Sequence, residues 1–268
     1  MAPREPEPLT DLNDPRLAPF AAVVGRARDG LAVVEGAIPA MRACGSGLPV
    51  DTVLCTPSHV DRLRAHVPES AHWWCAHKDV LSSLLGFSFH RGVLASVQVP
   101  GPGSIDSVAL QAREAPLVAV AVGFTDPANV GALLRAARAL GVDHVLLDAA
   151  AADPFARKAI RASAGHVLSV PLTLCEELLP QTLALREELG ADLLALTPTG
   201  ETSLRTIQGR RSRIVAFGSE GPGLPDAWLE ASDARVRIPL AHDVDSLNVA
   251  SAAAVTFYAL DGARAPGG

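Results

Sequence analysis

Short apolar runs alternate with amphipathic stretches over residues 117–260, and this alternation limits the possible folds more than any other feature of the sequence. The runs expected to be strands lie at 117–122, 144–148, 166–170, 192–197, 213–218 and 235–240. The stretches expected to be helices lie at about 129–140, 154–163, 173–189 and 247–260. Such an alternation predicts an α/β domain with a mostly parallel sheet covered by helices. Ligands of these sheets bind beyond the carboxyl ends of the strands.

A shorter series of the same kind occupies residues 16–100, with expected strands at 31–36, 51–56, 72–76 and 92–99. It predicts a small N-terminal α/β domain. Residues 1–15 are rich in proline and charge, so we expect a flexible tail there. Residues 101–114 have the proline and glycine content of a linker, and the second domain then covers 115–268.

The overall charge and the cysteines exclude few classes of function. The net charge of −6 carries no global signal for nucleic-acid binding, although local basic patches remain compatible with it. No signal peptide and no apolar run of 18 residues appear, which predicts a soluble cytoplasmic protein without a membrane partner. The four cysteines lack the paired spacing of a zinc site. The stretch HWWCAH at 72–77 is interpreted as a half-buried strand, and no metal is expected.

The first of three polar loops follows the strand at 117–122 and contains Asn129, Gly131 and Arg135. We expect Asn129 to be the N-cap of the next helix. Helical side chains lean toward the N-terminus, so Arg135 should reach back over Gly131 toward the start of that helix. A glycine beneath an arginine leaves room for a ligand, at a cost of about 1 kcal/mol in helix stability relative to alanine. An ordinary solvated arginine on the helix surface is the alternative.

The second loop, FGSEGPGLP at 217–225, also follows an expected strand. Gly218, Gly221 and Gly223 permit sharp turns and leave backbone polar groups uncovered. Glu220 places a carboxylate inside the loop. The glycine spacing differs from the dinucleotide-binding fingerprint, and a plain structural turn is the alternative.

The third loop covers 238–249, after the last expected strand. Ser246 is the expected N-cap of the final helix, and Leu247 and Asn248 belong to its first turn, where free N–H groups bind polar ligand atoms. Simple capping would explain this loop on its own. Three loops of one sheet nevertheless each carry a residue type that folding does not require, which favours a site at the strand ends.

These loops resemble the three motifs of the SpoU family of RNA ribose methyltransferases, within the SPOUT superfamily. The first motif, N-x-G-x-x-x-R, is matched at 129–135, the second, G-S/A-E-G-x-G, at 218–223, and the third, I-P-M…S-L-N-V, at 238–249. The segment RKAIRASAGHVLSVPL at 157–172 is similar to a further family segment. The likeness spans about 115–262. Residues 28–99 more loosely resemble the ribosomal-protein-like RNA substrate-binding domain of many members.

The resemblance implies a C-terminal domain with a deep trefoil knot, S-adenosylmethionine bound in a bent shape, and a homodimer formed through the knot helices. It implies methylation of a ribose 2′-hydroxyl in structured RNA, and the appended small domain favours ribosomal over transfer RNA. The implied cofactor-binding residues are Gly218, Glu220, Gly221, Ile238, Leu240, Leu247 and Asn248. The implied catalytic residues are Asn129, Arg135, Glu220, Ser246 and Asn248.

Arg135 has two possible roles in the implied reaction. Its pKa exceeds about 12, which makes it an awkward base, although help from an RNA phosphate would permit proton removal. We favour stabilisation of the developing alkoxide together with bidentate phosphate binding. The sequence departs from the family at Leu240, where methionine is common and leucine is a tolerable substitute, at His242, where glycine is frequent, and at Ala250, where serine is frequent. His242 leaves the path of the cofactor loop open.

RNA binding requires local positive charge despite the net negative charge. The candidate phosphate contacts are Arg157, Lys158, Arg161, Arg210 and Arg211. Ordinary solvated charges are the alternative. Two other classes of function also remain: a non-catalytic RNA-binding or ribosome-associated protein that retains the knotted fold, and a dinucleotide oxidoreductase. The second lacks the G-x-G-x-x-G fingerprint and its downstream acidic residue.

Overall fold

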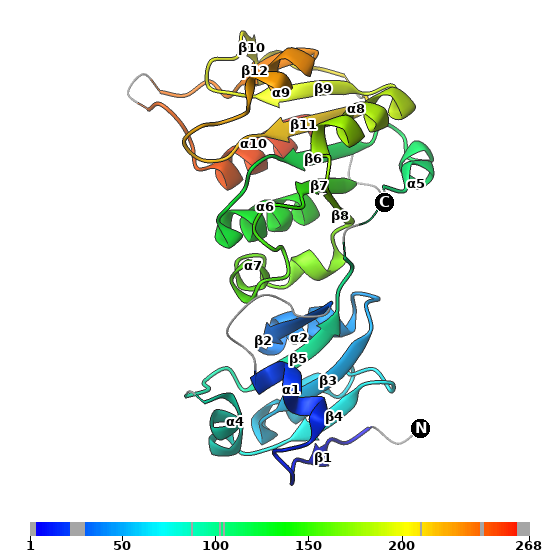
Figure 1. Cartoon of the computed structure of the whole chain (residues 1–268), viewed down its shortest axis with the longest axis vertical. Helices are drawn as coiled ribbons and strands as arrows, with labels where there is room; N and C mark the ends of the chain where they lie inside the picture. Colours follow the sequence, from blue (N-terminus) through cyan, green and yellow to red (C-terminus); the bar gives the residue numbers. More distant parts are fainter. Residues whose placement is uncertain are drawn as a thin grey trace. The chain divides into compact units, whose positions relative to one another are not determined.

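The structure is a computed structural model, and it describes residues 4–21, 30–86, 88–101, 103, 105–209, 211–241 and 244–261. The chain divides into two compact units (Figure 1). The first unit comprises Met1–Gly101 and Asp153–Ser169, and the second comprises Pro102–Ala152 and Val170–Gly268. The sequence predicts a single division of the chain at the linker 101–114. The observed division is different, because residues 153–169 pack with the N-terminal part of the chain.

The first unit is built on a five-stranded sheet with the strand order β1-β4-β3-β5-β2. Its strands are β1 (Glu7–Pro8), β2 (Leu31–Glu35), β3 (Val50–Cys55), β4 (His72–Cys75) and β5 (Val93–Gln98). Its helices are η1 (Pro15–Leu17), α1 (Ala18–Ala21), α2 (Ala37–Cys44), η2 (Pro57–His59), α3 (Val60–Leu63), α4 (Lys78–Leu85), α7 (Arg157–Ala162) and η3 (His166–Ser169). Strand β5 pairs antiparallel with β2 and β3, so this sheet is mixed. One of its faces buries a cluster that includes Phe20, Leu54, Trp74 and Phe89.

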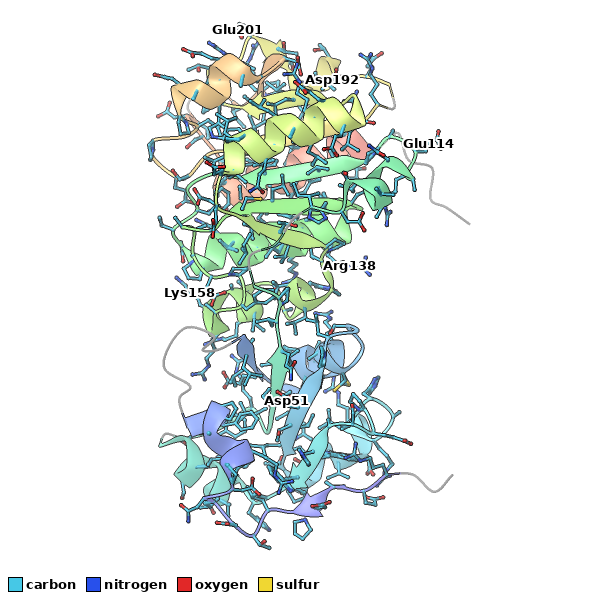
Figure 2. The ribbon with its side chains drawn as sticks, turned by 45° about the vertical axis from the view of Figure 1, so that its right-hand side comes forward. Asp51, Glu114, Arg138, Lys158, Asp192 and Glu201 are labelled. Carbon is cyan, nitrogen blue, oxygen red and sulfur yellow. The ribbon has the colours of Figure 1, made fainter. Side chains whose placement is uncertain are left out.

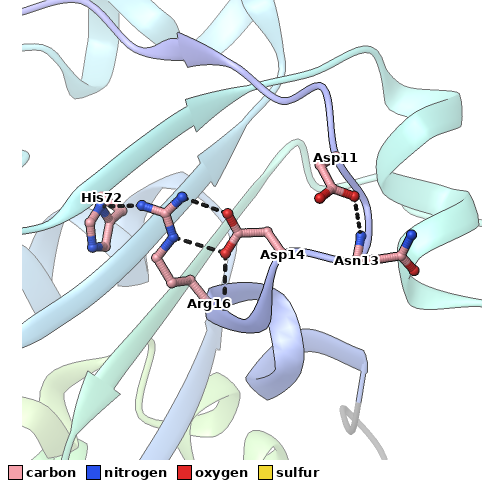
Figure 3. A network of polar contacts seen from close by, with 5 residues as sticks. All are labelled: Asp11, Asn13, Asp14, Arg16 and His72. Atoms are coloured by element: carbon pink, nitrogen blue, oxygen red, sulfur yellow. Dashed lines mark hydrogen bonds and ion pairs between the residues drawn. The ribbon is translucent and has the colours of Figure 1, made fainter.

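The N-terminal segment is attached to the first unit, although the sequence predicts a flexible tail over residues 1–15. Strand β1 pairs with the end of β4. Arg16 Nε donates a 2.8 Å hydrogen bond to Asp14 Oδ1, and Arg16 Nη1 lies 3.1 Å from His72 Nδ1 (Figure 3). The Arg16 guanidinium also stacks 4.5 Å from the centre of the Trp74 ring. These contacts join residues 7–16 to β4.

A buried carboxylate connects residues 153–169 to the rest of the first unit. Glu35, at the end of β2, is 5% exposed, and its Oε2 accepts hydrogen bonds from Arg157 Nε at 2.9 Å and Nη2 at 2.6 Å. Arg91 Nε lies 3.5 Å from Oε1 of the same carboxylate. Gly165 adopts a positive φ of 85°, and an added Cβ would lie 2.9 Å from Pro39 Cα. Both the ion pair and the glycine thus favour close packing of this segment.

The second unit contains a fully parallel seven-stranded sheet with the order β10-β12-β9-β11-β6-β7-β8, as the sequence predicts for an α/β domain. Its strands are β6 (Leu117–Ala121), β7 (His144–Asp148), β8 (Leu172–Cys175), β9 (Asp192–Leu196), β10 (Thr202–Ser203), β11 (Arg213–Phe217) and β12 (Ala234–Arg237). Its helices are α5 (Ser107–Gln111), α6 (Pro127–Ala139), α8 (Leu178–Leu189), η4 (Leu204–Thr206), α9 (Asp226–Ala231) and α10 (Val249–Asp261).

Alternate residues of each strand face opposite helical layers. On one face, Val118, Val120 and Ile214 belong to a core cluster with Leu185 of α8 and Trp228 of α9. On the other, Phe217 of β11 meets Phe257 of α10 edge to face, with ring centres 5.4 Å apart. Helices α6 and α10 pack against each other on this side (Figure 1). The sheet is therefore covered on both faces, which explains its continuous apolar strands.

Two expected elements differ in the structure. Residues 166–169 form the 3₁₀ helix η3, whereas the sequence predicts a strand over 166–170. The strand is instead β8, immediately afterwards, and helix α8 then begins at Leu178. The left-handed residues Ala164 and Gly165 and the following Pro171 explain the shift, because they turn the chain before a strand can start. Helix α9, the short β10 and helix α5, which lies within the expected linker at 101–114, were not expected.

Candidate active site

A pocket of about 700 Å³ lies beyond the carboxyl ends of β9, β11 and β12, in the second unit. Three loops form it, and each directly follows one of these strands. The pocket is lined by residues 196–199, 217–224, Asp226, Leu229, Ile238, Leu240, 246–249 and Ala252. Its position agrees with the general rule for ligands of parallel sheets.

After β6 the chain enters α6 at Pro127, earlier than the sequence predicts. Asp126 is the N-cap, and its side chain accepts a hydrogen bond from the backbone N–H of Ala128 at 3.0 Å. Pro127 occupies the first helical turn, a position that suits it because its nitrogen carries no hydrogen. The expectation that Asn129 is the N-cap is thus wrong. The side chain of Asn129 is instead available for a contact outside its own helix.

The loop after β11 folds back on itself. Gly223 N–H donates a 3.1 Å hydrogen bond to the Ser219 carbonyl, and these two residues form an isolated antiparallel bridge. An added Cβ at Gly218 would lie 2.1 Å from the backbone carbon of Gly223, so only glycine fits there. Gly221 has a positive φ of 89°, in the region that glycine alone adopts readily. This geometry presents Glu220 at the exposed tip of a tight turn.

Helix α10 is capped by Asn248 rather than by Ser246. The Asn248 Oδ1 atom accepts hydrogen bonds from the backbone N–H groups of Ala250 at 3.0 Å and Ser251 at 3.4 Å. Ser246 lies two residues before this cap, in the wall of the pocket. The expectation that Ser246 is the N-cap is therefore wrong, although its place at the pocket is retained.

The nitrogen of the Asn248 amide joins its own loop, after β12, to the loops after β6 and β11. Its Nδ2 donates to Asn129 Oδ1 at 3.1 Å and to Glu220 Oε1 at 2.6 Å. One side chain thus caps a helix with its oxygen and holds two other polar side chains with its nitrogen. Asn129 lies 119 positions and Glu220 lies 28 positions before Asn248 in the chain. One residue of each of the three motifs therefore meets the other two at this point.

Arg135 lies on α6, and its side chain is exposed. Within the described residues it makes no hydrogen bond or salt bridge, and it does not line the pocket. Gly131, one turn earlier, is buried. The Arg135 guanidinium therefore has no hydrogen-bond partner among the described residues, whereas Asn129 on the same helix accepts a hydrogen bond from Asn248.

The seven residues that the resemblance implies for cofactor binding all line the pocket. Sequence reasoning missed two further parts of its wall. One is the loop Leu196–Thr199 after β9, where Thr197 Oγ1 and Thr199 Oγ1 lie 3.2 Å apart. The other is Asp226 with Leu229, on α9. The loop after β9 could have been predicted, because it follows the expected strand at 192–197 and ligands bind at the carboxyl ends of parallel strands.

The candidate RNA contacts have different surroundings. Arg157 is paired with the buried Glu35. Arg161 and Lys158 of the same helix are exposed, and Figure 2 shows Lys158. Arg211 is exposed, with Nη1 3.6 Å from Asp192 Oδ2. Arg210 lies outside the described residues, as does His242 of the third loop.

No described helix is both long and apolar enough to cross a membrane. Among the residues whose positions the structure gives, no group of three or more histidine, cysteine or acidic side chains could hold a metal ion. His72 of the HWWCAH stretch instead lies beside Arg16. Burial raises the pKa of the Cys55 thiol to about 12, so this cysteine is protonated at neutral pH.

Known proteins are similar to the chain over nearly its whole length. Residues 116–258 match the model of the SpoU rRNA Methylase family. A Mycobacterium tuberculosis protein named as an uncharacterized tRNA/rRNA methyltransferase is 36% identical over 264 residues, which cover 93% of this chain and 90% of that protein. A 23S rRNA (guanosine-2'-O-)-methyltransferase RlmB of Burkholderia is 32% identical over 216 residues, 78% of this chain and 87% of its own length. The crystal structure of the SpoU methyltransferase AviRb from Streptomyces viridochromogenes, in complex with AdoMet, superposes with a TM-score of 0.79 at 26% identity, and covers 95% of this chain and 100% of that one.

Proposed function

The chain belongs to the SpoU rRNA methylase family, and we infer from this membership and from its pocket that it transfers a methyl group from S-adenosylmethionine to a ribose 2′-hydroxyl of RNA. The observation that carries the proposal is the hydrogen-bonded group of Asn129, Glu220 and Asn248 at the edge of the pocket. It joins the three family motifs at one place. A chain that kept only the fold would not need these three polar side chains together.

The pocket suits S-adenosylmethionine, which supplies an activated methyl group when bound. Ile238, Leu240 and Leu247 offer apolar contacts, and the loop around Gly218 and Gly221 offers backbone groups that no side chain covers. The pocket is also large enough for a molecule of this size, at about 700 Å³. We assign the cofactor-binding role to the predicted residues on these grounds.

We assign Arg135 to the ribose 2′-oxygen and a neighbouring phosphate. Its exposed guanidinium has no partner among the described residues, and a planar fork of donors matches a phosphate or a developing alkoxide. Asn129, Glu220, Ser246 and Asn248 would assist by fixing the position of the sugar. Catalysis then consists largely of orientation and charge stabilisation, because the sulfonium group is already reactive.

Ribosomal RNA is our preferred substrate over transfer RNA. The support is the first unit, which loosely resembles a ribosomal-protein-like RNA-binding domain, and a relative named for 23S rRNA that covers 78% of this chain. Lys158 and Arg161 on α7 of that unit are exposed candidates for phosphate contacts. A cytoplasmic location remains a prediction from the sequence.

A homodimer formed through α10, with a trefoil knot in the second unit, is also part of the proposal. Val255 and Tyr258 of α10 are 43% and 73% exposed, and both lie on the same side of the helix as Ser251. Apolar side chains at this spacing on a surface helix favour a partner. The knot is supported by the path of the chain, which runs from the central strand β11 to β12 on the far side of β9 and back to α10 beside α6.

Mapping ribose methylation in total RNA, with and without the gene, tests the function directly. We expect one or more 2′-O-methyl groups to disappear from ribosomal RNA and to return with the wild-type gene. If the methyl groups disappear from transfer RNA instead, the substrate is transfer RNA and the proposed reaction still holds. Unchanged methylation, together with no binding of S-adenosylmethionine in calorimetry, would favour the non-catalytic RNA-binding alternative.

A further inference from the structure

Among the residues that the structure describes, the charged side chains that line the pocket are all acidic. Among the described residues that line it, Glu220 and Asp226 are the charged ones, and no lysine, arginine or histidine is present. The remaining walls are apolar or carry hydroxyl, amide and backbone groups. The pocket therefore has a formal charge of −2 from these two carboxylates, and nothing in its described lining offsets it.

The two carboxylates belong to one continuous stretch of chain, the loop after β11 and the start of α9. The loop Gly218–Leu224 is closed by the Ser219–Gly223 bridge, and it leads directly into α9, whose first residue is Asp226. Glu220 is fixed by its 2.6 Å hydrogen bond from Asn248. Asp226 is exposed and has no hydrogen bond or salt bridge within the described part of the chain. Its charge is thus free to act on a ligand in the pocket.

Methyl transfer changes the charge of the molecule in such a pocket. The sulfonium–methyl bond breaks with both electrons left on sulfur, a carbon–oxygen bond forms to the ribose, and the hydroxyl proton leaves. S-adenosylmethionine has a net charge of +1, whereas the product S-adenosylhomocysteine is neutral overall. The two ligands share their adenosine and amino-acid groups, so the field of the pocket distinguishes them mainly at sulfur.

We propose that Asp226, together with Glu220, makes the pocket select the cationic methyl donor over its neutral product. Asp226 then acts as a specificity residue that favours loading of the donor and release of the product. This inference rests on the proposed function, because it requires S-adenosylmethionine to bind here. Asp226 lies outside the three motifs, and Glu220 is the only other contributor to the effect among the described lining residues.

Calorimetric affinities for both ligands test the inference without measuring catalysis. We expect Asp226→Asn to weaken S-adenosylmethionine binding by about two- to fivefold and to leave S-adenosylhomocysteine binding unchanged, as suits a solvent-exposed charge. Sinefungin, which carries an amine in place of the sulfonium, should follow S-adenosylmethionine. The preference for the cation should also decrease in high salt. Glu230→Gln, an exposed change on the same helix that does not line the pocket, is the matched control and should alter neither affinity.

The possible outcomes separate the inference from the function on which it rests. An equal loss for both ligands would assign Asp226 to a group that they share and would overturn the proposal. No change for either ligand, or the same change in Glu230→Gln, would also overturn it. Failure of the wild-type protein to bind S-adenosylmethionine at all would instead reject the proposed function.

Discussion

The side-chain nitrogen of Asn248 donates a 2.6 Å hydrogen bond to Glu220, a residue 28 positions earlier in the chain. The oxygen of the same amide caps α10. The two ends of one small side chain thus serve different purposes, one structural and one directed at the site. Separate substitutions should distinguish these purposes.

Asn248→Ala and Asn248→Asp form a matched pair. Alanine removes the cap, so the free energy of unfolding should fall by about 1 kcal/mol, whereas aspartate keeps an acceptor for the helix N–H groups and should retain most of the stability. Both changes remove the donor to Glu220, and aspartate adds a second carboxylate beside it. We expect both variants to lose methylation, measured in single turnovers, while urea denaturation separates their stabilities. Full activity of Asn248→Asp would show that the donated hydrogen bonds are unnecessary.

Arg135→Lys should retain the positive charge and lose the planar fork of donors. We expect the rate of methylation to fall by about 10²-fold, in the range for removal of a donor that stabilises developing charge. Affinity for S-adenosylmethionine should be unchanged, because Arg135 does not line the pocket. The control is Arg138→Lys, an exposed change on the same helix (Figure 2). Wild-type turnover in Arg135→Lys would contradict both roles considered for this residue.

Arg157→Met should destabilise the first unit by leaving Glu35 buried with its more distant partner Arg91. Breaking a fully buried pair costs about 3–5 kcal/mol, and we expect a loss of about 2 kcal/mol because the Arg157 side chain is 31% exposed. Thermal and urea unfolding measure it. Glu35→Gln combined with Arg157→Met should recover part of the loss, and Arg161→Met on the same helix should have little effect. A loss just as large in Arg161→Met would indicate that the helix matters rather than the ion pair.

Tyr258→Glu should convert the proposed dimer into a monomer. A charge on the exposed face of α10 would be desolvated if that face is covered by a second copy. Sedimentation velocity measures the mass of the species. Val108→Glu provides the control, because Val108 of α5 has the same 73% exposure as Tyr258. Equal dimerisation of the two variants would place the interface elsewhere, and a monomeric wild-type protein would reject the dimer.

Acid should release the contact between Asp14 and Arg16. Hydrogen bonds from Arg16, chiefly from its side chain, lower the pKa of Asp14 from its usual 3.8 to about 2. The interaction favours the ionised carboxylate, so its stabilising effect is complete above the higher value and disappears as the pH falls through the lower one. Carboxyl NMR titration should report a midpoint near pH 2, and Arg16→Gln should move it upward. A midpoint near 4 in the wild-type protein would mean that this pair does not form in solution.

The order of strands and helices in the second unit was largely predictable, because apolar period and turn residues carry that information. The two helix starts at the site were not. Residue preferences allow Asp126 or Asn129, and Ser246 or Asn248, as caps with nearly equal ease. The choice depends on hydrogen bonds between residues far apart in sequence, such as Asn248 to Asn129. Pro127 beside Asp126 was the one local signal for the earlier cap.

Of the two carboxylates of the pocket, Glu220 was predicted from the sequence, whereas Asp226 could not be. Asp226 belongs to α9, a helix of only six residues outside the three motifs, so its place in the pocket wall could not be read from its neighbourhood in the sequence. The buried partner of Arg157 was equally inaccessible, because Glu35 lies 122 positions away and both residues are ordinary surface types. Such long-range ion pairs depend on tertiary packing, which local residue patterns do not reveal.

The chain leaves the second unit after Ala152, contributes residues 153–169 to the first, and returns at Val170. The two units are therefore interleaved along the gene, and a single crossover cannot exchange one of them intact between relatives. A hybrid that took only residues 1–101 from another protein would place a foreign β2 opposite the native α7, and the match between Glu35 and Arg157 would depend on chance. Units interleaved in this way must be inherited or transplanted as two stretches that change together.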